Sequence, residues 1–116
     1  MNELIRDTYV EINLDNIAYN MKNIKAMVGE DVKIAAVLKA DAYGHGAVEV
    51  AKMGMENGAD YIAVATLNEA LEIRNRYRNY RILIMGFTPD RLLEYIEKND
   101  ITQTIFSYRQ AKLLSE

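Results

Sequence analysis

The sequence predicts an α/β fold built on a parallel β-sheet, and three observations carry that prediction. Four short runs rich in apolar and β-branched residues are candidate strands, and each is followed by a helix-start signal. These strand–helix units recur roughly every 20–27 residues, as parallel βα repeats do. Two architectures fit this order: an open doubly wound sheet and the first part of a (β/α)8 barrel.

The N-terminal part predicts one strand and one helix. Residues 9–14 alternate apolar and polar side chains, which is typical of a short half-buried strand. Asp15 is expected to cap a helix that ends at Gly29, because glycine favours the position just after a helix. The apolar residues of this helix recur at helical spacing: Ile17, Met21, Ile24 and Val28.

The first two βα units follow directly. Residues 33–40 predict a strand, and residues 46–57 predict a helix that stops at Gly58. Residues 60–66 predict the next strand, and residues 66–69 have the spacing of a capping box that opens a helix.

The third and fourth units complete the pattern. Residues 81–87 predict a strand, and residues 88–90 (TPD) are expected to supply an N-cap, a first-position proline and a first-turn acid. Residues 101–106 predict the last strand, and residues 107–110 a second capping box. Only about two helical turns of sequence follow, so we expect the chain to be the N-terminal portion of a larger domain.

Composition excludes several classes of function. The net charge of −3 gives no basic field for nucleic acid or an anionic membrane, and no apolar run approaches the roughly 20 residues of a membrane span. Without cysteine and with one histidine, a zinc site is not expected. The N-terminal segment has no apolar core of a secretory signal, so we expect a cytoplasmic protein. The arginine-rich run at 74–81 is expected to form a solvated helix face and its exit loop.

Lys39 is the candidate functional residue, because it closes an apolar strand. Side chains alternate along a strand, so Ala35, Val37 and Lys39 share one face and the bulkier set faces the helices. In both architectures the functional site lies at the carboxyl ends of the strands, where Lys39 is placed. Burial lowers the pKa of an amine there and makes it a nucleophile for a Schiff base.

A structural interpretation of the same residues stays open at this point. A strand-end lysine commonly extends to water or pairs with an acid, and Asp41 is nearby. Tyr43 in a glycine-flanked turn is commonly a surface or packing residue, and His45 between two glycines is commonly solvated.

The string AVLKADAYGHGA at residues 36–47 resembles the pyridoxal phosphate attachment motif of the alanine racemases. The segment TYVEINLDNIAYNMKNIK resembles the start of that family, and DYIAVATLNEALEIR and ILIMGFTP resemble later pieces in order and spacing. The resemblance covers nearly the whole chain.

The resemblance implies a fold-type III pyridoxal 5′-phosphate enzyme, with an N-terminal (β/α)8 barrel and a C-terminal β domain. It also implies a head-to-tail homodimer that supplies D-alanine for peptidoglycan. It implies that Lys39 holds the cofactor as an internal aldimine and acts as one of two bases on alanine. Tyr43 matches a residue that reaches the cofactor phosphate region, and Val37 matches a position lining the cofactor.

The chain departs from the family in length. The second half of the barrel, the opposite base and the C-terminal β domain are missing, so the chain is expected to be an inactive fragment that self-associates or exists only within a larger protein. Two alternatives stay open: a non-catalytic pyridoxal phosphate-binding barrel protein and a self-associating structural half-barrel. Borohydride trapping on Lys39 would separate the structural alternative from the others.

Overall fold

A computed structural model describes residues 6–116 of the chain. Residues 1–5, which begin the predicted domain and the segment searched for a secretory signal, lie outside the described residues. Four strands form one sheet in the order β1-β2-β3-β4, and every neighbouring pair is parallel. The strands are β1 (Ala35–Val37), β2 (Tyr61–Val64), β3 (Ile82–Ile84) and β4 (Thr102–Gln103). The predicted parallel βα repetition is confirmed.

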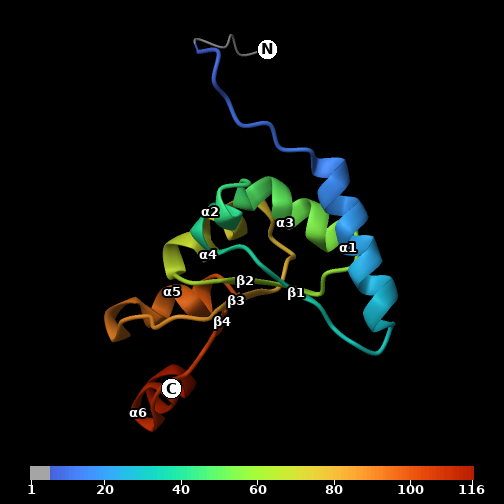
Figure 1. Cartoon of the computed structure of the whole chain (residues 1–116). Helices are drawn as coiled ribbons and strands as arrows, with labels where there is room; N and C mark the ends of the chain where they lie inside the picture. Colours follow the sequence, from blue (N-terminus) through green and yellow to red (C-terminus); the bar gives the residue numbers. More distant parts are fainter. Residues whose placement is uncertain (1–5) are drawn as a thin grey trace.

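Helices alternate with these strands, and together they form part of an α/β barrel (Figure 1). Helix α3 runs between β1 and β2, α4 between β2 and β3, and α5 between β3 and β4. Helix α1 precedes the sheet and packs along α3, which also contacts α4. The helical elements are α1 (Leu14–Val28), α2 (Lys39–Tyr43), α3 (Ala47–Glu56), α4 (Leu67–Arg76), the 3-10 turn η1 (Asp90–Leu92), α5 (Leu93–Lys98) and α6 (Tyr108–Ser115).

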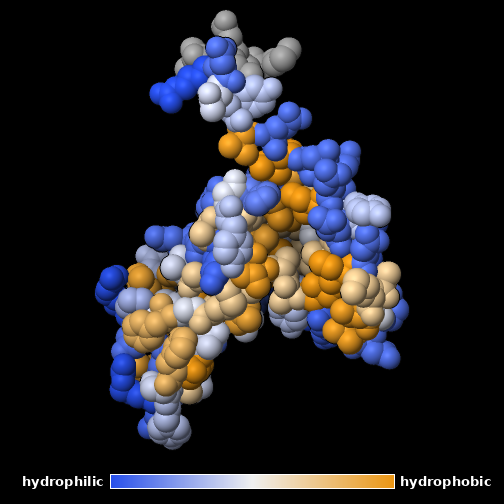
Figure 2. Space-filling model, viewed as in Figure 1, coloured by the Kyte–Doolittle hydropathy of each residue, from blue (hydrophilic) through white to orange (hydrophobic). Residues whose placement is uncertain are grey.

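The two faces of the sheet differ in burial. The helix-facing side carries a continuous aliphatic row in register, and its members are buried: Ala36, Ile62, Val64, Ile82 and Ile84. The opposite side is open at β1 among the described residues, where Val37 is 41% exposed, although its register partner Ala63 of β2 is buried. Figure 2 shows apolar residues exposed in the middle of the view, with hydrophilic residues over the outer side of α1. The core therefore lies between the sheet and its helices.

The strand predicted at residues 9–14 is wrong. Residues 8–13 form no regular element, and Tyr9 and Val10 are 59% and 82% exposed. The helix that follows begins two residues earlier than predicted, because Asn13 rather than Asp15 is its N-cap and accepts a hydrogen bond from the Asn16 amide. An alternating pattern without a neighbouring strand has no backbone partners, so it stays irregular.

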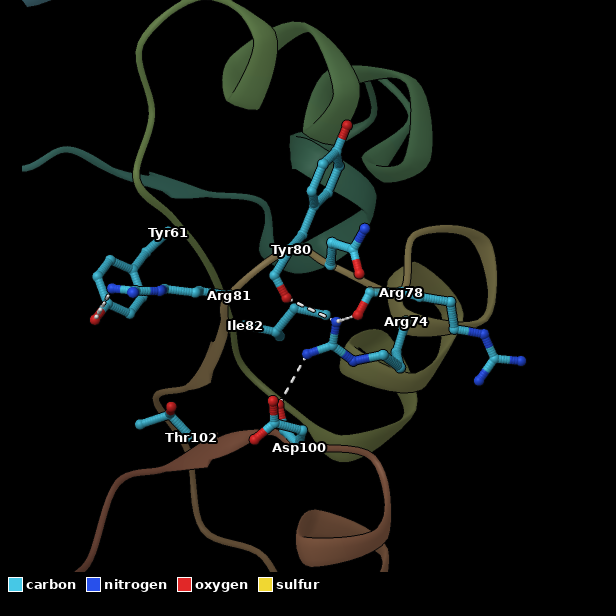
Figure 3. A pocket seen from close by; sticks show the side chains of 9 residues that line it. Tyr61, Arg74, Arg78, Tyr80, Arg81, Ile82, Asp100 and Thr102 are labelled. Atoms are coloured by element: carbon cyan, nitrogen blue, oxygen red, sulfur yellow. Dashed lines mark hydrogen bonds between the residues drawn. The ribbon is translucent and has the colours of Figure 1, made fainter.

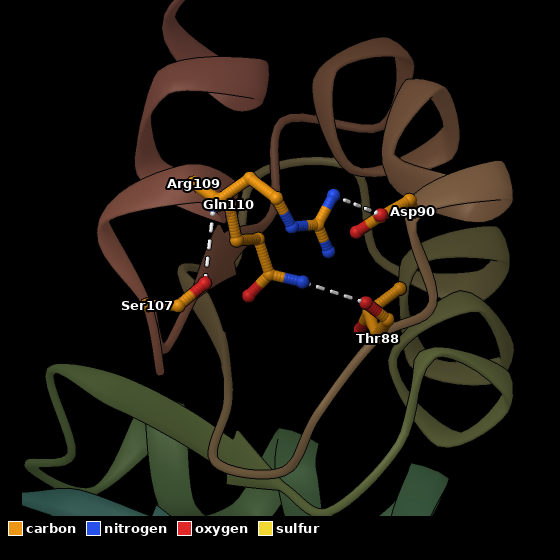
Figure 4. A network of polar contacts seen from close by, with 5 residues as sticks. All are labelled: Thr88, Asp90, Ser107, Arg109 and Gln110. Carbon is orange, nitrogen blue, oxygen red and sulfur yellow. Dashed lines mark hydrogen bonds and ion pairs between the residues drawn. The ribbon is translucent and has the colours of Figure 1, made fainter.

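Two of the predicted helix starts differ in detail, and Figure 4 shows the contacts of Ser107 and Gln110 at the second of them. Thr88 does not cap a helix, since its buried hydroxyl donates to Gln103 Oε1 at 2.6 Å and Pro89 takes the N-cap position. Ser107 caps α6 as predicted, but the Gln110 side chain donates to the Thr88 carbonyl instead of completing a capping box. Gln110 Oε1 is buried without a hydrogen-bond partner among the described residues. These buried amides tie α6 to the loop after β3.

Arg74 contradicts the expectation of a solvated arginine run, because it is only 4% exposed. Its guanidinium lies beside a hollow of about 420 Å³ at the amino ends of β2, β3 and β4 (Figure 3). Burial lowers the pKa of Arg74, and the negative charge of Asp100 opposes that shift. Its nitrogen atoms donate, at 2.7–3.2 Å, to the backbone carbonyls of Tyr77, Arg78, Tyr80, Asn99 and Asp100. Arg74 thus joins the end of α4 to the turn before β4.

Substitution of two glycines is expected to change stability in opposite directions. A Cβ at Gly86 would lie 2.4 Å from the Ala65 carbonyl oxygen, so Gly86→Ala should destabilise the chain by about 1–3 kcal/mol. A Cβ at Gly54, within α3, would make ordinary contacts of 3.6–3.8 Å, so Gly54→Ala should stabilise it by about 0.5–1 kcal/mol. Urea unfolding of both variants measures this, and equal effects of one sign would contradict it.

Candidate functional site

The carboxyl end of β1 runs into a left-handed turn, α2, which begins at Lys39. The four residues at 40–43 have φ values of 53–55°, although none of them is glycine. For a residue with a side chain this conformation costs roughly 1–2 kcal/mol, because Cβ approaches the following carbonyl. A run of four must therefore be imposed by its surroundings.

Several interactions hold this turn. Ala42 is buried against the core, and Asp41 Oδ1 accepts a hydrogen bond from the Ala47 amide at the start of α3 at 2.8 Å. The backbone closes the turn through Ala42 N–H to Leu38 O (2.9 Å), Gly44 N–H to Ala40 O (3.2 Å) and Gly46 N–H to Asp41 O (3.0 Å). Gly44 and Gly46 end it with φ values of 89° and 91°. The turn is thus fixed to both the sheet and α3.

Lys39 follows β1 at the carboxyl end of the sheet, as predicted, but it is exposed rather than buried. Within β1, Ala36 is buried and Ala35 and Val37 are exposed, as the predicted alternation requires, and Lys39 beyond the strand is exposed as well. The strand itself is shorter than predicted and ends at Val37, two residues before the lysine. The expectation of a desolvated amine is therefore not met among residues 6–116, where Lys39 stays exposed.

No hydrogen bond or ion pair of the described residues engages the Lys39 amine. Asp41, the acid considered as its partner, instead accepts from the Ala47 amide. The ion pairs of the described chain lie elsewhere: Lys25 with Glu30, Lys98 with Glu94, and Arg109 with Asp90. The amine of Lys39 is consequently available for reaction at the carboxyl edge of the sheet.

The other predicted site residues lie around the same turn. Val37 is in register with Ala63 of β2 on the open side, and Tyr43 closes the turn with its side chain 61% exposed. The ring Nδ1 of His45 lies 3.0 Å from the Ala42 carbonyl, which can only accept, so this nitrogen carries the proton. His45 therefore supports the turn, whereas Val37, Lys39 and Tyr43 are all exposed.

Glu69 is a site residue that the sequence pattern presents only as a helix cap. Thr66 and Glu69 form the predicted capping box at the start of α4. The same carboxylate reaches across to the turn, where Glu69 Oε2 accepts a hydrogen bond from the Ala40 amide at 2.6 Å. A contact between residues 29 positions apart has no local signal, which is why the capping motif alone did not reveal it.

The cavities do not contradict this placement. A hollow of about 200 Å³ lies at the carboxyl ends of β2 and β3, between the starts of α4 and η1. The larger hollow beside Arg74 is at the opposite end of the strands. The Arg74 guanidinium there already donates its hydrogen bonds to backbone carbonyls. Among residues 6–116 no group of three His, Cys, Asp or Glu side chains is arranged to hold a metal ion. In the same part of the chain, each helix is too short or too polar to cross a bilayer.

Four parallel strands with helices between them, and a lysine just beyond the carboxyl end of the first strand, define a partial α/β barrel. Comparison with known proteins identifies its family. Residues 12–116 match the family model described as alanine racemase, N-terminal domain. Alanine racemase 1 of Clostridium acetobutylicum is 51% identical over 112 residues, covering 97% of this chain and 29% of that protein. Alanine racemase 1 of Caldanaerobacter subterraneus subsp. tengcongensis is 49% identical with the same coverage. The chain belongs to the alanine racemase family.

Solved structures agree with this assignment. The alanine racemase of Clostridium difficile 630 superposes with a TM-score of 0.90 at 46% identity, covering 97% of this chain and 31% of that one. The alanine racemase of Bacillus anthracis with bound L-Ala-P gives a TM-score of 0.89 at 40% identity, covering 96% and 29%. The chain thus spans less than a third of the length of these relatives.

Proposed function

We propose that this chain supplies the lysine-bearing part of an alanine racemase, which interconverts L- and D-alanine with pyridoxal 5′-phosphate. One observation carries the proposal: the Lys39 amine is free at the carboxyl edge of a partial barrel whose sequence matches alanine racemases along almost its whole length. The carboxyl edge is where barrel enzymes place their chemistry.

The residues around the turn fit the cofactor. An aldehyde needs an unpaired primary amine, and Lys39 has no partner among the described side chains. A flat ring needs an apolar surface, which Val37 offers on the open side of β1. A phosphate needs hydrogen-bond donors, and the exposed hydroxyl of Tyr43 stands at the far end of the same turn. Lys39, Val37 and Tyr43 are accordingly proposed as cofactor-binding residues.

Lys39 is proposed to have a second role as a base. When bound, the cofactor acts as an electron sink that makes the Cα proton of alanine labile. The amine of Lys39 would then take or return that proton on one side of Cα, and inversion needs a second base on the opposite side. Among the described residues none faces Lys39 across the open side of the sheet, so we place the second base outside this chain.

The proposal therefore assigns only part of the racemase to residues 1–116. The remainder of the barrel, a C-terminal β domain and a second subunit are proposed to supply the opposite base and the rest of the phosphate site. In that arrangement the partners are alanine and a second copy of the complete protein. The 116 residues alone should not racemise alanine.

A chimera tests this function directly. Residues 1–116 replace the matching segment of the Clostridium difficile alanine racemase, and D-alanine formation from L-alanine is followed with added pyridoxal 5′-phosphate. The chimera should retain activity within about tenfold of the parent, whereas the 116-residue chain should show none. A folded, inactive chimera would overturn the proposed function, and turnover by the short chain would overturn the assignment of the second base.

A further inference from the structure

Lys39 is flanked by two anchored backbone amides. On one side the Leu38 amide donates to the Ala63 carbonyl at 2.8 Å, which continues the pairing of β1 with β2. On the other side the Ala40 amide donates to Glu69 Oε2 at 2.6 Å. Both acceptors belong to the β2–α4 unit. The backbone of Lys39 is therefore fixed between two points of one rigid neighbour.

The two oxygens of the Glu69 carboxylate accept hydrogen bonds from different donors. Oε1 accepts from the amides of Ala65 and Thr66, each at 3.0 Å, and from the Thr66 hydroxyl at 3.2 Å. Oε2 is left for Ala40 alone. An amide bonded to an ionised carboxylate makes a shorter and stronger hydrogen bond than one bonded to a neutral acceptor. One side chain thus caps α4 and fastens the first residue of the left-handed run.

We propose that Glu69 is a positioning residue, whose carboxylate locks the left-handed turn after β1 and so holds Lys39 where it meets the cofactor. The inference rests on the proposed function only in naming the cofactor as the molecule that Lys39 contacts. The clamp itself follows from the hydrogen bonds, because residues 40–43 need an external restraint to stay at positive φ. Without this bond the Lys39–Ala40 peptide loses one of its restraints, and the position of the Lys39 side chain is less well defined.

Glu69→Gln separates the clamp from the cap. Glutamine serves in a capping box as glutamate does, so its single carbonyl oxygen can keep the donors of Ala65 and Thr66. Its amide group, a donor, then faces the Ala40 N–H, and the clamp is lost. Thr66→Ala is the complementary variant, because it weakens the cap and leaves the Ala40 bond. Glu72→Gln, on the exposed side of α4, removes the same charge from the same helix.

Two readouts decide the proposal in the 116-residue chain. Hydrogen exchange of the Ala40 amide should accelerate at least about tenfold in Glu69→Gln and remain unchanged in Glu72→Gln and Thr66→Ala. The apparent affinity for pyridoxal 5′-phosphate, followed by its absorbance change on reaction with Lys39, should fall about tenfold in Glu69→Gln only. The urea midpoint of Glu69→Gln should stay near the wild type, so a general loss of stability would not explain the affinity change.

Each result bears on one hypothesis. Unchanged Ala40 exchange in Glu69→Gln, or equal loss of affinity in all three variants, would overturn the clamp. Absence of any Lys39 adduct in the wild type would contradict the proposed function, while Ala40 exchange would still decide the clamp. If Glu69→Gln does not fold, a scalar coupling across the bond from the Ala40 amide to the Glu69 carboxyl carbon in the wild type supports the clamp, and its absence overturns it.

Discussion

Replacing Lys39 by arginine is expected to lower D-alanine formation by the chimera at least about 1,000-fold. Arginine keeps the positive charge and the length of the side chain, but its guanidinium neither condenses with an aldehyde nor exchanges protons near neutral pH. The substitution removes the proposed covalent anchor and the proposed base together. Initial rates with saturating alanine and cofactor measure the effect.

Lys33→Arg is the matched control, because Lys33 is exposed on the same segment before β1. Its activity should equal that of the unmodified chimera. Retention of more than a tenth of the activity in the Lys39→Arg chimera would show that another group carries the chemistry, and the assignment of Lys39 would then be abandoned.

Replacing Arg74 by alanine is expected to destabilise the chain by about 1–3 kcal/mol, the loss typical when buried hydrogen-bond acceptors are left without a donor. Arg74 is 4% exposed, and loss of its guanidinium leaves several carbonyls between α4 and β4 without a donor. A small domain has only about 5–15 kcal/mol of total stability, so the loss is a sizeable fraction of it. The midpoint and slope of urea unfolding measure the change.

Arg78→Ala provides the comparison for this prediction. The Arg78 side chain is exposed, while its backbone carbonyl, which alanine retains, is one of the acceptors of Arg74. Its effect should stay within about 0.5 kcal/mol of the wild type. Similar stabilities of the two variants would show that the buried hydrogen bonds contribute little.

Local spacing was sufficient to predict much of the fold. The pleat of β1 places Ala36 against the helices and Ala35 and Val37 on the other side, because strand side chains alternate regardless of tertiary context. The cap at Thr66 followed from a spacing of three residues. Both features depend only on residues close together in the chain, so they can be predicted from local sequence.

The details that shape the site depend on distant contacts. Ala40, Asp41 and Tyr43 have no strong local preference for positive φ, and the left-handed turn exists because core packing and Glu69 impose it. Arg74 lies in an arginine-rich run typical of a solvated helix face, yet tertiary contacts bury it. The alternating apolar and polar residues at 9–14 form no strand, because no neighbouring strand of the described chain pairs with them. Local pattern cannot supply these features, because each is decided by residues far away in the chain.

The central claim, that Lys39 on its left-handed turn is the attachment point for the cofactor, is tested most directly by trapping. The chain is mixed with pyridoxal 5′-phosphate, reduced with borohydride, digested and mapped by mass spectrometry. We predict one dominant reduced adduct, on Lys39, which is lost in Lys39→Arg and retained in Lys33→Arg. An adduct spread over the exposed lysines, or none on Lys39, would contradict the claim.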